Sequence, residues 1–508
     1  MPSLVGSEMC IRDSLTCVRP AAGGLGHTIL GLPRPATSVR VTLTGRASTE
    51  VCVLSLTVGV EVAAAAAGDR TRGDEARWDS ASVIAGWAAD GGFSDYVAYE
   101  RDGEWTFAAG ARARVVLTAE SIAITEDGTT VESPWSGRAS TALSRALGAL
   151  ESDNWDALGY LNFDFCAAHH DLAHLVPSGS VLAHLIVPEV TVVVTADDIR
   201  FGRCDSATRA RLTALAERGW IEPTPSPVDV RTDADGFTER VGRALAEIDR
   251  GDYQKVILSR QVAVPYDIDL PATYALGRRH NNPARSFLFS LDGMSAAGFS
   301  PELVVSVDIN GSVTTEPLAG TRAIGASAED DARHRRQLMT DAKEIAEHAI
   351  SVKACYSEIE SVAAPDTTAV TEFMAIRRRG SVQHLASTVR GQLAAHHDSW
   401  QALEALFPSI TASGIPKTPA LEAIYRLEEH RRGLYSGAVL TASSAGQLEA
   451  TLALRTVFAS AEGAWIRAGA GIVGQSTPER EYEETCEKLS SVAPFLVRRA
   501  EVREGAGK

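Results

Sequence analysis

The sequence predicts a mixed α/β (α+β) protein in which most strands are antiparallel. Short segments that alternate apolar with polar residues recur along the N-terminal half, as expected for strands with one buried face. A length of 508 residues, with 45% hydrophobic and 22% charged residues, suits one large α/β body or two to three average domains. The expected strands are 93–99, 105–107, 114–117, 121–125, 130–131 and two within 181–195 around Pro188, and the expected helices are 135–150, 206–218 and 238–249.

The charge balance and the cysteines argue against several classes of protein. With 49 basic and 65 acidic residues the net charge is −16, which disfavours a general nucleic-acid or membrane-surface binder. The seven cysteines are scattered and form no CxxC pair, so we expect neither a disulfide framework nor a structural zinc site, and a reduced cytoplasm fits best. The longest apolar run, 51–68, is interrupted by Glu61 and is too short and too rich in alanine to span a bilayer.

Composition divides the chain into three segments. Residues 1–45 mix Pro, Gly, Arg and Ser without a helical or strand period, so we expect a non-native or disordered leader, with a transit peptide as the alternative. Residues 46–235 form an N-terminal scaffold half, which ends in the proline-rich connection 223–235. Residues 236–500 contain most of the motifs, and we expect this C-terminal half to make one integrated body with the preceding half.

Near the C-terminus, small residues precede an acidic helix. A short strand is expected to end near Ile466 and to enter a Gly469-Ala470-Gly471 turn, after which a helix begins. On that helix Glu481, Glu484 and Lys488 are spaced i, i+3 and i+7 and share one face. Such a face is often merely solvated, with an i, i+4 ion pair. Alternatively, the backbone N–H groups of the turn bind an anion while the acids hold a divalent cation beside it.

A second acidic helix is expected at 341–348. Glu344, Glu347 and His348 fall on one of its faces, which taken alone indicates a solvated surface. The first acidic helix gives it a possible partner, because Glu347 and Glu484 could share one hard cation through oxygen ligands. His348 does not indicate zinc, since no Cys or other His is in register with it.

Two charged residues stand in apolar surroundings where acid–base chemistry would be possible. Lys255 lies in the expected strand 253–260 and is either an edge-strand residue that prevents aggregation or a base. Glu302 follows a turn expected at Gly298 and Pro301, and its apolar neighbours would raise the pKa of its carboxyl, as a general acid requires. The alternative for Glu302 is an ordinary surface position.

Four further polar residues are weaker candidates. The N–H and hydroxyl of Thr321 could grip a carboxylate, although an ordinary turn is the simpler interpretation. Tyr435 and Arg455 are donors suited to a carboxylate, but single residues of these types are more often surface or capping residues. His384 either lines one cavity together with these residues or is a hydrogen-bonded histidine of the core.

These motifs, in this order, resemble the chorismate-utilising enzymes of the anthranilate synthase component I type, and most closely the siderophore-pathway salicylate synthases. The resemblance covers residues 238–497 densely, and its most specific parts read GFSPE, PLAGTRA, DAKEIAEH, FPSITASGIPK, RGLYSGAV, GAGIV and STPEREYEETCEKL. It implies a single large two-lobed body of mixed, mostly antiparallel sheets flanked by helices, with the active site between the lobes. The C-terminal half, 236–500, would then be the chorismate-binding catalytic half.

The resemblance also implies roles for individual residues. Lys255 matches the base that activates water against C2 of chorismate, and Glu302 matches the acid that protonates the departing C4 hydroxyl. Isochorismate would form first, and salicylate and pyruvate would follow. The matched Mg²⁺ ligands are Glu347 and Glu484, with Glu344 and Glu481 behind them, and the matched substrate contacts are Gly320, Thr321, Thr411, Tyr435, Arg455, Gly469, Ala470, Gly471 and Lys488.

Differences among the relatives favour a salicylate synthase. Anthranilate synthases usually have Gln where Lys255 stands, aminodeoxychorismate synthases have Lys at Ala319, and isochorismate synthases typically read HPTPA at 407–411. An isochorismate synthase is the main alternative, and an anthranilate synthase component or a non-catalytic homologue are others. The expected ligands are chorismate and Mg²⁺. The expected protein is a cytoplasmic monomer without a glutaminase subunit, nucleic acid or membrane partner.

Overall fold

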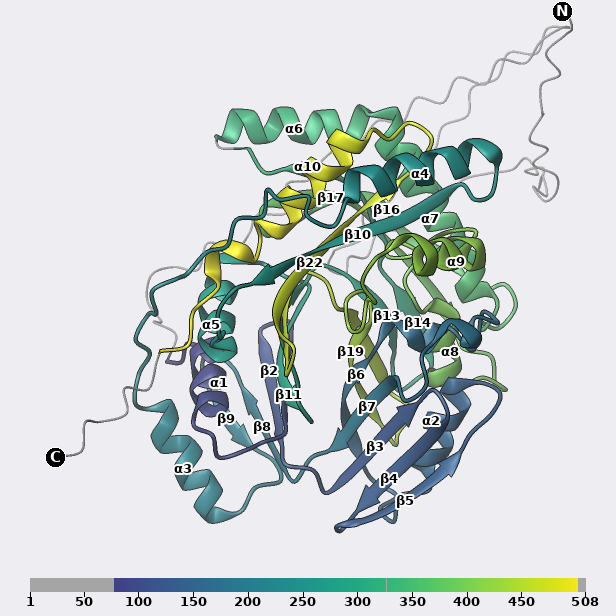
Figure 1. Ribbon diagram of the computed structural model, residues 1–508. Coiled ribbons are helices and arrows are strands. Elements are labelled where there is room, and N and C mark those ends of the chain that lie inside the picture. Colours follow the sequence, from purple (N-terminus) through teal and green to yellow (C-terminus); the bar gives the residue numbers. More distant parts are fainter. Residues whose placement is uncertain (1–76, 326, 501–508) are drawn as a thin grey trace, which may run out of the picture. The chain divides into compact units, whose positions relative to one another are not determined.

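The computed structural model describes residues 77–325 and 327–500, and their fold is a pair of large sheets flanked by helices (Figure 1). Neighbouring strands in this part of the chain pair antiparallel. This is the mixed α/β fold, with mostly antiparallel sheets, that the sequence predicts. The expected leader 1–45 and the first part of the expected scaffold half, 46–76, lie outside the described residues.

Ten strands make one sheet and twelve make the other in the described part of the chain. The ten-stranded sheet has the order β18 (Gly414–Ile415), β10 (Lys255–Val264), β22 (Gly463–Ile472), β21 (Thr456–Ser460), β12 (Met294–Ser300), β11 (Arg285–Leu291), β1 (Tyr96–Arg101), β2 (Glu104–Ala109), β8 (Val190–Val194) and β9 (Ile199–Phe201). The twelve-stranded sheet has the order β15 (Leu318–Ala323), β17 (Val382–Gln392), β14 (Ser312–Thr315), β13 (Leu303–Val307), β20 (Leu448–Leu452), β19 (Ala438–Ser443), β6 (Asp156–Leu161), β7 (Val181–Val187), β3 (Ala113–Thr118), β4 (Ser121–Glu126) and β5 (Thr129–Pro134), and β16 (Ala369–Arg379) pairs with β17.

Each sheet combines strands from both halves of the chain. In the ten-stranded sheet β1 pairs with β11, and in the twelve-stranded sheet β6 pairs with β19. The two sheets face each other near their centres, where Tyr160 of β6 stacks on Phe289 of β11 with ring centroids 5.3 Å apart. Apolar residues of both sheets form one buried cluster there, which includes Val97, Ile186 and Val439. Burial of this shared cluster ties the two sheets together.

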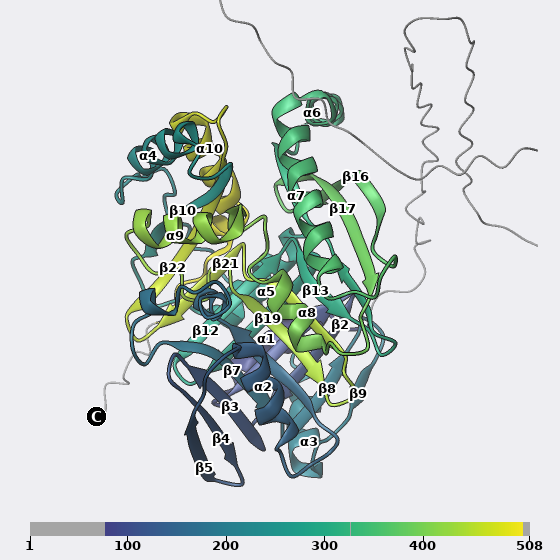
Figure 2. The ribbon, with the colours of Figure 1, turned by 90° about the vertical axis from the view of Figure 1, so that its right-hand side faces the viewer.

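Helices cover the outer faces of the sheets. Helix α1 contacts both α3 and α5, and α5 contacts β12, whereas α2, α7 and α8 pack on the twelve-stranded sheet. Helices α4, α9 and α10 contact β10 or β22, and Figure 2 shows α4 and α10 side by side above these strands. The helices are α1 (Ser80–Ala89), α2 (Ala139–Gly148), α3 (Ser206–Ala216), α4 (Phe237–Arg250), α5 (Leu270–His280), α6 (Ala328–Thr340), α7 (Ala342–Glu360), α8 (Ser399–Leu406), α9 (Lys417–Leu427) and α10 (Pro478–Leu489).

Most expected elements occur, with shifted ends. The helix expected at 135–150 begins only at Ala139. Trp135 lies before it and donates its Nε1–H to the carbonyl of Thr118. The strands on either side of Pro188 join different sheets, β7 the twelve-stranded and β8 the ten-stranded one. The connection 223–235 contains neither helix nor strand.

The helices of the described residues are all too short or too polar to cross a lipid bilayer.

Candidate active site

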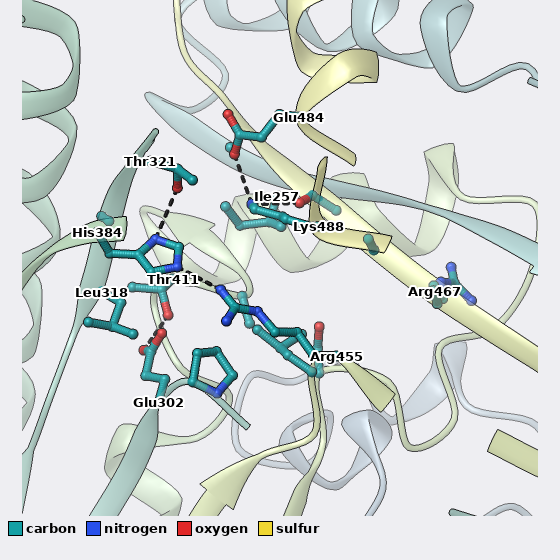
Figure 3. A pocket seen from close by; sticks show the side chains of 18 of the residues that line it. Ile257, Glu302, Leu318, Thr321, His384, Thr411, Arg455, Arg467, Glu484 and Lys488 are labelled. Carbon is teal, nitrogen blue, oxygen red and sulfur yellow. Dashed lines mark hydrogen bonds and ion pairs between the residues drawn. The ribbon is translucent and has the colours of Figure 1, made fainter. Parts of the chain in front are cut away.

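One pocket gathers almost all of the predicted site residues. It spans about 890 Å³ of space not filled by atoms, part of which is open to solvent. Strands β10, β15, β17 and β22 and helices α7 and α10 contribute to its walls (Figure 3). Ala470 and Glu481 are predicted site residues that do not line it. The predicted residues that do are Lys255, Glu302, Gly320, Thr321, Glu344, Glu347, Thr411, Tyr435, Arg455, Gly469, Gly471, Glu484 and Lys488.

Lys255 is a buried lysine at the start of β10. Its side chain is 1% exposed, and its Nζ lies 3.0 Å from Oε1 of Glu347 and donates to Oγ of Ser351 at 3.2 Å. Strand β10 lies between β18 and β22, so Lys255 is not the edge-strand residue that the sequence left possible. A buried amine with one carboxylate partner, facing a ligand-sized pocket, is placed to exchange a proton with a bound molecule.

Glu302 is a buried carboxyl in the short link between β12 and β13. It is 3% exposed, and its Oε1 accepts hydrogen bonds from Oγ of Ser409 at 2.9 Å and from the hydroxyl of Thr411. Burial raises the pKa of Glu302 to about 7, even though both hydroxyls and the charge of Lys255 act in the opposite direction. The carboxyl therefore holds its proton to a higher pH than an ordinary glutamic acid does, as a general acid requires.

A chain of hydrogen bonds crosses the pocket from Arg455 to Thr321 (Figure 3). Nη2 of Arg455 donates to Nε2 of His384 at 2.7 Å, and because a guanidinium only donates, the imidazole proton must be on Nδ1. Nδ1 then donates to Oγ1 of Thr321 at 3.1 Å, so the hydroxyl proton of Thr321 is available to a ligand. Burial and the charge of Arg455 lower the pKa of His384, which agrees with a neutral ring.

Arg455 is a buried cation that no carboxylate of the described residues neutralises. It is 7% exposed, and apart from His384 its guanidinium donates to the carbonyl of Arg379 at 2.6 Å. Burial and the neighbouring charge of Arg379 lower the pKa of Arg455. A buried charge without a counter-charge is unfavourable. The pocket is therefore electrostatically suited to an anionic ligand that would pair with Arg455.

Four glutamates from two helices form an acidic face beside the pocket: Glu344 and Glu347 of α7, and Glu481 and Glu484 of α10. Asp341 caps α7 by accepting from two backbone N–H groups of its first turn, which fixes where this helix begins. In the structure a cation pairs with each glutamate. The pairs are Arg322 Nη1–Glu344 Oε1 (2.8 Å), Lys255 Nζ–Glu347 Oε1 (3.0 Å), Lys343 Nζ–Glu481 Oε1 (3.1 Å) and Lys488 Nζ–Glu484 Oε1 (2.8 Å).

The acidic face fits a hard divalent cation. No three His, Cys, Asp or Glu side chains of residues 77–325 and 327–500 form a ready-made metal-binding group. Mg²⁺, however, is usually held by only one or two carboxylates together with water and substrate oxygens. Oε2 of Glu481 is buried without a hydrogen-bond partner, and burial and the charge of Glu484 raise the pKa of Glu481. One carboxylate oxygen of the acidic face is therefore left without a partner, which a metal ion would supply.

The turn predicted at Gly469-Ala470-Gly471 is wrong, because these residues belong to strand β22. Strand β22 continues to Ile472, paired with β10. The glycines make room for neighbouring groups: a Cβ on Gly471 would lie 2.6 Å from Oε1 of Glu347, and one on Gly469 would lie 2.7 Å from the carbonyl oxygen of Leu258. Ala470 is fully buried in the apolar core, so a contact between its side chain and a ligand is not expected.

Two other predicted turns are also strand positions. Gly298 lies inside β12, where a Cβ would come 2.3 Å from Cζ of Phe287. Gly320 lies in β15 with φ of 82°, at an irregularity in the pairing with β17, so here glycine is needed for the backbone itself. The carboxylate that the N–H of Thr321 binds in this structure is the protein's own, Oε2 of Glu344 at 3.0 Å.

Three polar residues that the sequence motifs did not single out hold the predicted ones. Ser409 supports Glu302, Ser351 supports Lys255, and Lys343 pairs with Glu481. Helical spacing was an available signal for two of them, because 343, 347 and 351 are each four residues apart and share one face of α7. For Ser409 the only local signal was its position two residues before Thr411 in the same segment.

Comparisons with known proteins show the family of this chain. A family model of chorismate binding enzymes matches residues 95–494. The salicylate synthase of Mycolicibacterium paratuberculosis (strain ATCC BAA-968 / K-10) is 46% identical over 425 residues, which are 83% of this chain and 94% of that protein. Anthranilate synthase component 1 of Aquifex aeolicus (strain VF5) is 33% identical over 299 residues, 58% of this chain and 60% of that protein.

A solved structure shows the same fold. The menaquinone-specific isochorismate synthase of Escherichia coli superimposes with a TM-score of 0.61 at 22% sequence identity, over 82% of this chain and 91% of that one. The family match spans most of the described residues and includes every predicted site residue. The chain therefore belongs to the family of chorismate binding enzymes.

Proposed function

We propose that this chorismate-utilising enzyme is a Mg²⁺-dependent salicylate synthase, which forms isochorismate from chorismate and then salicylate and pyruvate. The observation that carries the proposal is the placement of a buried amine, Lys255, and a buried carboxyl of raised pKa, Glu302, in one pocket with the unpaired Arg455. The salicylate synthase that is 46% identical over most of the chain supports the same assignment.

In the first step Lys255, in its neutral amine form, takes a proton from a water molecule, whose oxygen attacks C2 of the ring. The ring double bond shifts, and the C4 hydroxyl leaves with the proton that Glu302 donates. One water is consumed and one is released, so isochorismate is an isomer of chorismate. Lys255 has then gained a proton and Glu302 has lost one, and both return to their starting states by exchange with solvent.

The substrate's two carboxylates need positive or hydrogen-bonding partners within an acidic protein. Arg455 uses one N–H of Nη1 and one of Nη2 for Arg379 and His384, so the other N–H donors of its planar guanidinium are left for a substrate carboxylate. The hydroxyl proton of Thr321 is free because His384 donates to its oxygen. Gly469 and Gly471 line the pocket, and the missing side chain at Gly469 lets the hydroxyl of the buried Tyr435 approach β22 closely.

The second step needs a fixed conformation more than a further catalytic group. The hydrogen on C2 moves to the methylene of the enolpyruvyl arm as the C–O bond breaks, and salicylate and pyruvate result. Holding the arm over the ring lowers the entropic part of the barrier. Ile257 and Leu318 line the pocket and contribute apolar surface that can restrict the bound arm.

The acidic face supplies the residues that would hold Mg²⁺. Glu347 and Glu484 line the pocket and are the proposed ligands, with Glu344 and Glu481 behind them. When bound, the metal would supply positive charge that stabilises both these carboxylates and a substrate carboxylate. We further propose that the product enters siderophore biosynthesis and that no glutaminase subunit is required.

Incubation of the purified protein with chorismate and Mg²⁺, followed by chromatography, tests the proposal. Salicylate and pyruvate in equal amounts are expected, and EDTA should stop their formation. Isochorismate that accumulates without pyruvate would instead identify an isochorismate synthase. Anthranilate formed when ammonium is added would contradict the assignment, because a water-activating Lys255 should not direct ammonia to C2.

A further inference from the structure

Lys343 lies at the junction between the acidic face and a second cavity. Loop residues 251–254, the loop 473–475 and one side of α7 line this cavity, and Lys343 is among the lining residues. Glu347 lines both this cavity and the candidate active site. The acidic face is therefore bordered by two spaces, and Lys343 stands on the side away from the ring-binding pocket.

We propose that Lys343 is an internal counter-ion, which holds the metal-free acidic face together and is displaced from it when Mg²⁺ binds. This inference rests on the proposed function, because it assumes that the acidic face is the metal site. It assigns to Lys343 the role of a positioning residue that competes with the metal.

The contacts of Lys343 differ from those of the other cations of the acidic face. Its Nζ forms one hydrogen bond among the described residues, to Oε1 of Glu481. By contrast, Lys488 also donates to the carbonyl of Gly469, and Arg322 also contacts Asp341. The side chain of Lys343 is 20% exposed, whereas that of Glu481 is 0% exposed. Lys343 can therefore swing into the second cavity, while Glu481 is fixed in place.

The charges give the reason for this displacement. Four carboxylates pair with four basic side chains in the structure, so the acidic face is locally neutral. A divalent ion would add two positive charges before a dianionic substrate arrives. Repulsion between Mg²⁺ and a neighbouring ammonium in a partly buried site is strong. Lys343 has the fewest hydrogen bonds of these four side chains and borders the second cavity, so it is the one expected to leave.

Titration of Mg²⁺ into the metal-free protein, without chorismate, tests the inference by calorimetry and by the shift of the thermal midpoint. Lys343→Met removes the charge but keeps the length of the side chain. We expect its Mg²⁺ Kd to be about three- to tenfold lower than that of the wild type, which is the scale of one ion pair. Its thermal midpoint in EDTA should fall, because Glu481 then lacks its counter-ion.

Two matched variants control for net charge and for packing. Lys353→Met changes an exposed lysine of the same helix and should leave the Mg²⁺ Kd within about twofold of the wild type. Lys343→Arg keeps the positive charge and should retain the wild-type midpoint in EDTA. A Kd for folded Lys343→Met that is unchanged or higher would overturn the inference. A wild type that binds no Mg²⁺ at all would instead overturn the metal-dependent proposed function.

Discussion

Replacement of Glu302 with glutamine separates its chemical role from its effect on stability. Glutamine has almost the same size as glutamate, and its amide oxygen can accept hydrogen bonds from the hydroxyls of Ser409 and Thr411. The amide, however, carries no acidic proton. Glu302→Gln is therefore expected to lose turnover. It should also become more stable than the wild type as the pH rises, because a buried ionised carboxyl no longer forms.

The size of the stability effect follows from the pKa of about 7 in the folded protein against an ordinary value of 4.5. The folded protein holds this proton more tightly than the unfolded chain does. The stability that this proton gives the folded protein is fully present below pH 4.5 and is lost as the pH rises through 7. Since Glu302 is 3% exposed, solvent screens it little. Between pH 5 and pH 8 the free energy of unfolding of the wild type should therefore fall by about 2 to 3 kcal/mol relative to that of the variant.

Urea unfolding of both proteins at pH 5 and pH 8 measures this difference, and chorismate turnover is assayed in parallel. Comparing the two pH values cancels any constant cost of the amide. If the difference in free energy of unfolding between variant and wild type were the same at both pH values, Glu302 would not be the neutral buried acid described above. Turnover equal to the wild type would show that another group protonates the C4 hydroxyl.

Three further substitutions test other parts of the site. Lys255→Ala should abolish isochorismate and salicylate formation with the fold intact by circular dichroism; product at the wild-type rate would place the base elsewhere. Arg455→Lys loses the planar fork and should raise the KM for chorismate about tenfold, and unchanged KM in steady-state kinetics would remove Arg455 from substrate binding. Gly471→Ala places a methyl 2.6 Å from Oε1 of Glu347, so more Mg²⁺ should be needed for half-maximal activity; an unaltered Mg²⁺ titration would refute this.

The sequence indicated which side chains gather in the pocket better than it indicated the backbone that carries them. Lys255 and Glu302 stand out because a charged residue within an apolar segment either is buried with a functional role or lies at a sheet edge or on the surface. The glycines of β22 were misassigned because glycine most often marks a turn. Glycine is required there because distant segments approach β22 closely, Leu258 at Gly469 and Glu347 at Gly471, and no local pattern reveals such contacts.

Pairings between distant segments likewise could not be predicted from the sequence. Alternation shows which face of a strand is buried but not which strand is its partner, so the step from β7 to β8 across Pro188 gave no sign that the chain changes sheets. The pair between Lys343 and Glu481 spans 138 positions. Each of its members looks like an ordinary residue on a charged helix face.

The central claim is that Lys255 directs water to C2 while Glu302 releases the C4 hydroxyl, before pyruvate leaves. Mass spectrometry of salicylate made from chorismate in oxygen-18 water tests it most directly. The account predicts that the phenolic oxygen of salicylate comes from the solvent and carries the label. Unlabelled salicylate would contradict it, because the oxygen would then derive from chorismate itself.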